Sequence, residues 1–126
     1  MLSITLVAIG GALGSVARYL MILGIANFYP SYFPFGTLAV NILGSFFIGL
    51  VSGLTNSKTW QEFLMVGVIG GFTTFSAYSF QTCKLAEGGR VGAASLYTIL
   101  SVVCCLLATF GGQASARAFV PVPPSE

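Results

Sequence analysis

Neutral hydrogen-bond donors make up most of the polar side chains within the apolar stretches of this sequence. The donors of interest are one amide and several hydroxyl groups, on Asn41, Thr37, Thr74, Ser76, Ser79, Tyr97 and Ser101. Phe75 and Tyr78 accompany them, and an aromatic ring carries the positive part of its quadrupole at its edge. We interpret this set as suited to a small anion that accepts hydrogen bonds strongly.

Groups for catalysis are missing from the same stretches. The sequence has no histidine, and Glu62 and Glu87 fall only at the ends of apolar segments. Hydrolytic and redox chemistry therefore lack their usual side chains, and we predict that the chain is not an enzyme. Cation or proton transport would need a carboxylate within the membrane, which argues against that class as well.

The interpretation rests on polar rows rather than on single residues. Any one hydroxyl in a membrane helix more often bonds the carbonyl four residues before it, and Phe75 and Tyr78 alone would more often be packing residues. Two helical segments, however, carry polar or thiol side chains at intervals of four, which places each set on one helix face. These rows are Thr37, Asn41 and Ser45 in one segment, and Tyr97, Ser101 and Cys105 in another.

The third polar set lies in residues 70–82, within an otherwise apolar span. Gly70 and Gly71 weaken a helix where they stand, and Thr73 and Thr74 follow with hydroxyls that can replace regular backbone bonds. In lipid, backbone groups freed by a break must face protein or a wet cavity. We therefore predict a helix that is broken at mid-membrane, with its carbonyls and side chains lining an ion site.

Composition places the whole chain in a membrane. Only 6% of the 126 residues are charged, against about 25% in a soluble domain. The sequence predicts an all-α fold of four transmembrane helices, with approximate bounds Ser3–Ala26, Gly36–Leu54, Trp60–Ala86 and Val91–Phe119. These form a single domain over residues 1–126 that contacts membrane lipid and no nucleic acid, and we expect the tail from Val120 to be frayed.

Charged side chains give little orientation bias. Lys58 and Arg117 fall on one side of the predicted spans, whereas Arg18, Lys84 and Arg90 fall on the other. Because the asymmetry of Lys and Arg in loops sets orientation, we expect the chain to insert both ways round. Arg18 itself has two readings that stay open: a residue facing a wet cavity, or one that extends to the interface near a helix end.

Three motifs carry a resemblance to a known family. They are GGALGSVAR at residues 10–18, GTLAVNILG at 36–44 and GGFTTFS at 70–76. These motifs, their spacing and the total length resemble the CrcB/Fluc fluoride channels over essentially the whole chain. The resemblance implies antiparallel, dual-topology homodimers in the plasma membrane (the bacterial inner membrane) that passively export fluoride from the cytoplasm through two pores at the dimer interface.

The resemblance also implies roles for individual residues. Phe75 and Tyr78 match the two aromatic positions whose ring edges contact fluoride, and Asn41 matches a pore-lining amide. Tyr97, Ser101 and Cys105 match a polar track joined by Thr37, and Arg18 matches a vestibule arginine. The carbonyls of Gly70 and Thr73, from both subunits, would hold one structural sodium ion that is not transported.

Three residues depart from the family pattern. Tyr78 stands where phenylalanine is usual, Gln81 where glutamate is common, and Cys105 where serine is usual. A small multidrug-type exporter is the main alternative, but it would need a carboxylate in the first span, which carries Arg18 and no acid. A purely structural packing subunit is a third possibility, which leaves Asn41 and the polar rows unexplained.

Overall fold

The computed structural model describes residues 1–120, and every regular element in that range is a helix. Four segments are long and apolar enough to cross a membrane: Leu2–Phe28, Phe35–Leu54, Lys58–Glu87 and Val91–Phe119. The predicted all-α class and four spans are confirmed, and the predicted bounds differ from these only in terminal turns. The chain is thus a multi-pass membrane protein. Of the tail expected to be frayed, all but Val120 lies outside the described residues.

Three of the spans are continuous helices, whereas the third is assembled from several pieces. The continuous ones are α1 (Leu2–Phe28), α2 (Phe35–Leu54) and α6 (Val91–Phe119). The third begins with the single turn α3 (Lys58–Trp60) and the π-helical η1 (Gln61–Ile69). It continues through the short α4 (Gly70–Phe72) and ends with α5 (Phe75–Glu87). The π-helical stretch was not expected from the sequence.

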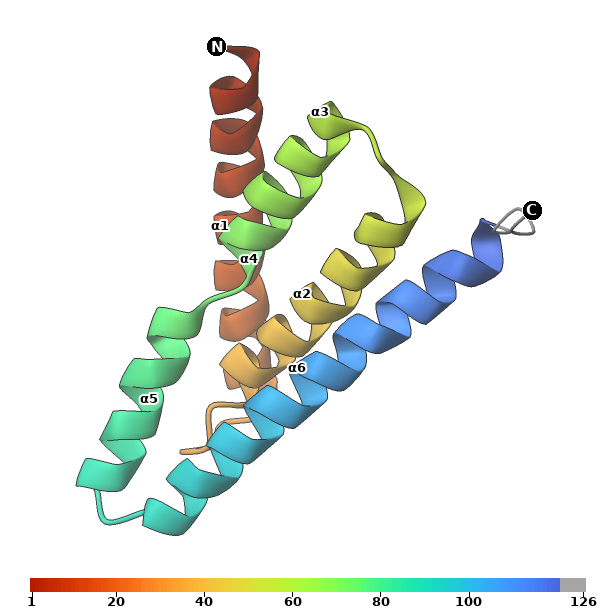
Figure 1. Ribbon diagram of the computed structural model, residues 1–126. Coiled ribbons are helices and arrows are strands. Elements are labelled where there is room, and N and C mark those ends of the chain that lie inside the picture. Colours follow the sequence, from red (N-terminus) through yellow and green to blue (C-terminus); the bar gives the residue numbers. More distant parts are fainter. Residues whose placement is uncertain (121–126) are drawn as a thin grey trace.

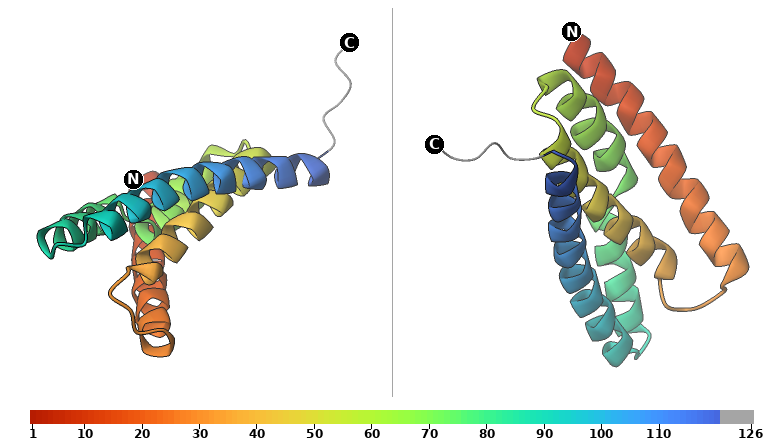
Figure 2. Two further views of the ribbon diagram at one scale, coloured as in Figure 1. Left: turned by 90° about the horizontal axis from the view of Figure 1, so that it is seen from below. Right: turned by 90° about the vertical axis from the view of Figure 1, so that its right-hand side faces the viewer.

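Two helix pairs form the body of the molecule. The helix α2 lies along α6, and α1 packs against η1 and α4, while α5 reaches across to α6 (Figures 1 and 2). The N-terminus, α3 and the C-terminal end of α6 lie toward one end of the molecule, and the α5–α6 turn lies at the other (Figure 1). Residue Gly89 has φ 77° in that turn, a conformation that favours glycine.

Glycines bring the paired helices into backbone contact. A Cβ added to Gly14 would overlap the carbonyl of Val68 in η1, and one added to Gly112 would overlap the carbonyl of Phe46 in α2. Gly10 and Gly14, four residues apart on one face of α1, are both buried. Small residues allow this approach in membranes, where close van der Waals packing holds helices together.

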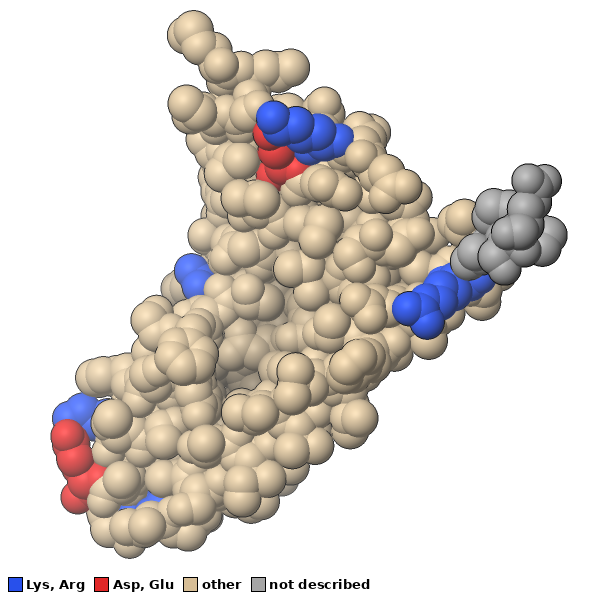
Figure 3. Space-filling model, in the orientation of Figure 1, with Lys and Arg blue, Asp and Glu red and all other residues tan. Residues whose placement is uncertain are grey.

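Apolar side chains cover most of the outer surface. Residues such as Leu13, Leu20, Ile99, Leu107 and Phe110 are more than half exposed. Charged side chains are confined to a few places on the face seen in Figure 3, and most of that face carries none. Such a surface suits contact with lipid or with another apolar surface.

Candidate functional site

The helical backbone of the third span is interrupted at Thr73 and Thr74. Thr73 has ψ 157° and Thr74 has φ −152° and ψ 114°, which are extended conformations. The N–H of Thr73 still donates to the Ile69 carbonyl, so the regular ladder ends at Thr73. The hydroxyl of Thr74 then accepts from the N–H of Ala77 at 3.2 Å and caps the start of α5.

The glycine pair lies beside this interruption rather than in it. Gly70 keeps helical angles, φ −61° and ψ −37°, and Gly71 lies within α4. A Cβ on Gly71 would come within 2.5 Å of the Gly11 carbonyl. The role that we expected for Gly71, weakening the helix, therefore needs correction: its lack of a side chain serves close packing against α1.

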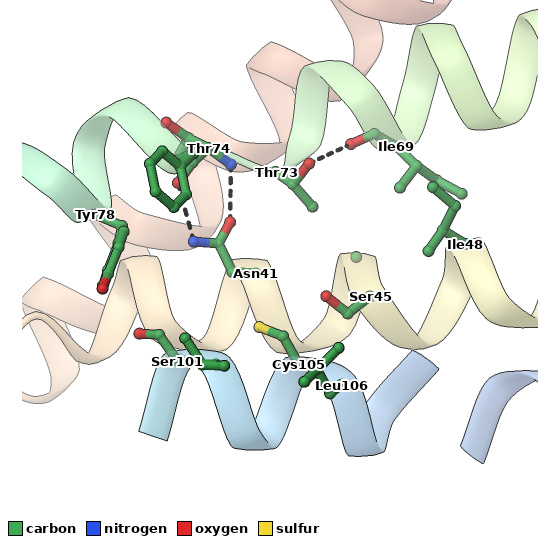
Figure 4. A pocket seen from close by; sticks show the side chains of 13 residues that line it. Asn41, Ser45, Ile48, Ile69, Thr73, Thr74, Tyr78, Ser101, Cys105 and Leu106 are labelled. Atoms are coloured by element: carbon green, nitrogen blue, oxygen red, sulfur yellow. Dashed lines mark hydrogen bonds between the residues drawn. The ribbon is translucent and has the colours of Figure 1, made fainter. Parts of the chain in front are cut away.

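The side-chain amide of Asn41 pairs with both backbone groups of Thr74. Its Nδ2 donates to the Thr74 carbonyl at 3.0 Å, and its Oδ1 accepts from the Thr74 N–H at 2.8 Å (Figure 4). This two-bond pairing satisfies polar groups that the regular helix would otherwise bond. Asn41 thus ties α2 to the interruption and keeps one N–H of its amide uncommitted by these two bonds.

Arg18 reaches the same interruption from α1. Its Nη1 donates to the Thr73 carbonyl at 3.2 Å, and the residue is half-buried. The carbonyls of Thr73 and Thr74 therefore accept hydrogen bonds from side chains of two different helices. This contact places a positive charge beside the interruption.

A cavity of about 400 Å³ opens next to Thr74. Its lining comes from α2, the third span and α6, and it holds many of the polar and aromatic positions singled out from the sequence (Figure 4). These are Asn41, Thr73, Thr74, Phe75, Tyr78, Ser101 and Cys105. None of the lining residues is charged, and Ser45, also a member of the row on α2, lies among them.

Two features of this lining bear on binding. The Ser101 hydroxyl is buried and has no hydrogen-bond partner within the described part of the chain. The rings of Phe75 and Tyr78 lie with centroids 5.2 Å apart, and Phe75 is 77% exposed. The cavity therefore combines a free buried hydroxyl with an aromatic pair whose outer member is mostly exposed.

The remaining predicted residues lie elsewhere. Thr37 lines a second cavity of about 330 Å³ near the α1–α2 loop, and its buried hydroxyl has no partner among residues 1–120. The Tyr97 hydroxyl donates to Oε1 of Gln81, which also lines this second cavity. Ser76 is exposed and shares a 3.3 Å hydrogen bond with Thr74. Arg18 and Gly70 are not part of either lining.

Residues that we had not assigned to the pathway also contribute. Gly44 lines the first cavity, and a Cβ there would overlap the Thr73 methyl group. Gln81 accepts from Tyr97 and so ties α5 to α6 beside the second cavity. The interval of eight between Thr37 and Ser45 is the signal that placed Ser45 on the polar face of α2. The Tyr97–Gln81 pairing has no such signal, because it depends on how α5 crosses α6.

The Gly70 and Thr73 carbonyls, which we expected to bind a sodium ion, differ in whether they already accept a hydrogen bond. In a continuous helix the Thr74 N–H would donate to the Gly70 carbonyl, but here it donates to Asn41. The Gly70 carbonyl is thereby released from its regular partner, as a ligand for a hard cation would be. The Thr73 carbonyl, by contrast, already accepts from the Arg18 guanidinium.

Comparison with known proteins identifies the family. Residues 5–113 match the family described as CrcB-like protein, Camphor Resistance (CrcB). The chain belongs to the CrcB family. Every residue of the two cavities, and both side chains that hold the interruption, fall within the part that matches this CrcB profile.

Individual members of the CrcB family are similar along nearly their whole length. One named "Fluoride-specific ion channel FluC", from Geobacter sulfurreducens, is 44% identical over 93% of this chain and 98% of its own. A protein of the same name from Agrobacterium fabrum is 45% identical over 93% and 98%, respectively. "Fluoride-specific ion channel FluC 2" from Nitrobacter hamburgensis is 41% identical over 89% of this chain and 94% of its own.

Proposed function

We propose that this chain is a fluoride channel and not an enzyme. The observation that carries the proposal is the uncharged cavity at Thr74, which combines a free Ser101 hydroxyl, the remaining Asn41 N–H and the Phe75–Tyr78 pair. The relatives named above as fluoride-specific ion channels support the same conclusion.

The donor set favours fluoride on physical grounds. Fluoride is small and accepts hydrogen bonds strongly, so hydroxyl, amide and ring-edge contacts can replace much of its hydration shell. Chloride and larger anions form weaker hydrogen bonds and would recover less from the same groups. A fixed cation in the lining would bind many anions tightly and slow their release, and the lining carries no such charge.

The functional unit that we propose is an antiparallel, dual-topology homodimer with two pores. The cavity opens to one side, and the Phe75 ring is 77% exposed, so a second subunit packed here would complete the wall. Each pore then runs along the interface past Phe75, Tyr78 and the polar rows. Passive flow through these pores in the bacterial inner membrane would carry fluoride out of the cytoplasm whenever its concentration there is higher.

The interruption at Thr73–Thr74 lies near mid-membrane in this arrangement. We propose that the Gly70 and Thr73 carbonyls of both subunits face one another there and hold a structural sodium ion. That ion would supply a fixed positive charge that balances the carbonyl dipoles at the interface. Asn41 keeps the extended backbone in place from its own subunit, which orients the Thr74 side of the cavity.

Ion efflux from liposomes tests the channel function directly. Purified protein is reconstituted with potassium fluoride inside, and valinomycin starts the efflux by letting potassium leave; potassium chloride liposomes are the matched control. We expect fast loss of fluoride and retention of chloride. Equal leakage of both anions, or no fluoride loss above protein-free liposomes, would refute the proposal.

The same experiment separates the alternatives. A proton-coupled exporter of cationic drugs would carry neither anion and would need an acid in the first span, whereas the α1 sequence contains none. A packing subunit would carry no ion at all. Fluoride-selective flux therefore excludes both alternatives in one measurement.

A further inference from the structure

The contact between Arg18 and Thr73 creates a conflict at the proposed sodium site. The Arg18 Nη1 donates to the Thr73 carbonyl at 3.2 Å, and this is the carbonyl that we propose as a sodium ligand. The residue is half-buried. In the described part of the chain the ion pairs are Lys58–Glu62 and Lys84–Glu87, so no acid there neutralises the guanidinium.

Two cations cannot share one carbonyl without repulsion. A sodium ion bound to the Thr73 oxygen would lie within a few ångströms of the guanidinium. At that separation, unit charges of like sign repel strongly even when partly screened. The neighbouring Thr74 carbonyl already accepts from the Asn41 amide, so a guanidinium displaced onto it would have to share that acceptor.

We propose that Arg18 competes with a monovalent cation for the Thr73 carbonyl, so that loss of the guanidinium tightens cation binding. This inference rests on the sodium site of the proposed function. Coupling between two ligands is reciprocal. A bound cation therefore also releases Arg18 from Thr73 and leaves the guanidinium free to meet an anion near the interruption.

Sodium-dependent stability of the purified dimer tests this competition. The protein is prepared in detergent without sodium, in N-methylglucamine chloride, and sodium chloride replaces that salt at constant ionic strength. The thermal midpoint, followed by fluorescence of Trp60, rises as a ligand binds the native state. Its dependence on sodium gives the half-saturating concentration without any measurement of flux.

Three variants make the test specific. Arg18→Gln removes the charge but keeps polar contact, and Arg18→Met removes the charge but keeps an unbranched side chain. Arg90→Gln is the control, because it removes the same charge at a different place. The Arg90 guanidinium lies over the Tyr32 ring in the loop region, 4.2 Å from the ring centroid. Size-exclusion chromatography checks that each variant remains a dimer.

We expect both Arg18 variants to lower the half-saturating sodium concentration by on the order of tenfold, with Arg90→Gln close to the parent protein. Unchanged or weaker sodium binding in the Arg18 variants that remain dimeric would overturn the competition. If neither the parent protein nor any variant responds to sodium while liposomes still lose fluoride selectively, the proposed sodium site is refuted, and this inference is refuted with it. Loss of fluoride selectivity itself would instead refute the proposed channel function.

Discussion

At the scale of single residues, Asn41 has two tasks. One N–H and the Oδ1 of its side chain pair with the Thr74 carbonyl and N–H at 3.0 and 2.8 Å, and these bonds leave the second N–H free. An asparagine amide has only two N–H donors and one carbonyl acceptor. The same side chain therefore holds the backbone of the interruption and offers a donor to the cavity.

Replacing Asn41 by aspartate should disable both tasks. Asn41→Asp keeps an acceptor for the Thr74 N–H, but its second oxygen faces the Thr74 carbonyl, and its charge repels an anion in a low dielectric. We expect fluoride efflux to fall to the protein-free level and the free energy of unfolding to drop by about 1–3 kcal/mol. Ser52→Ala, which removes a hydroxyl bonded only within its own helix, is the control. Normal efflux in Asn41→Asp would contradict this account.

Phe75 should matter for conduction and not for folding. Its ring is 77% exposed, so little of it packs within the subunit. Phe75→Ile therefore removes a ring edge while changing the buried apolar area of the subunit very little. We expect efflux to be abolished while size-exclusion chromatography still reports a dimer. Phe80→Ile changes another exposed phenylalanine of α5 outside the cavity lining and should conduct normally. Equal flux in the two variants would remove Phe75 from the pathway.

Sequence reasoning located these residues but not their partners. The polar row on one helix face marked Asn41 as a donor, yet its partner is a backbone group thirty-three positions away. That pairing depends on how α2 crosses the third span. Likewise the Tyr97 hydroxyl donates to Gln81 of α5, a residue that the sequence marked only as a departure from the family pattern.

At the scale of elements, the interruption shows which local preferences prevail. Thr73 and Thr74 take extended conformations, because the Thr74 hydroxyl can cap α5 and Asn41 can satisfy its peptide groups. The glycine pair has no such compensation and stays helical, with Gly71 packed against α1. Periodicity and hydrophobicity predicted the four spans well. The π-helical η1, which packs along α1, has no comparable signal in the sequence.

Adjacent glycines of α6 give a matched test of helix packing. In Gly112→Ala the new Cβ would overlap the Phe46 carbonyl, whereas in Gly111→Ala it meets nothing within 4 Å. We expect Gly112→Ala to lower the free energy of unfolding by about 1–3 kcal/mol, because α2 and α6 must separate. Gly111→Ala should leave it unchanged or raise it by up to about 1 kcal/mol through helix propensity. Unfolding in a denaturing detergent series measures both, and equal values would contradict the packing role.

At the scale of the whole molecule, orientation follows from very few charges. The sequence has only five Lys and Arg residues, two on one side of the predicted spans and three on the other, so we expect no strong bias in which side faces the cytoplasm. The N-terminus and the C-terminal end of α6 lie toward the same end (Figure 1). The orientation of the C-terminus therefore reports on the whole chain.

Reporter fusions at the C-terminus should reveal both orientations. Alkaline phosphatase is active outside the cytoplasm and green fluorescent protein inside, and we expect both fusions to give signal. Adding two lysines to the Lys58 loop should place that loop in the cytoplasm and silence the phosphatase. A single orientation in the parent chain would refute dual topology without affecting the liposome result.

If a second subunit completes the open side of the cavity, as we propose, flux must depend on how often subunits meet in the membrane. A solitary subunit would leave the exposed Phe75 ring and the open side of the cavity facing acyl chains, which cannot donate or accept hydrogen bonds. Pairing must therefore compete with dilution by lipid. As the protein-to-lipid ratio is lowered below the point where subunits meet, flux for each chain should fade, and genetically joining two copies should restore it.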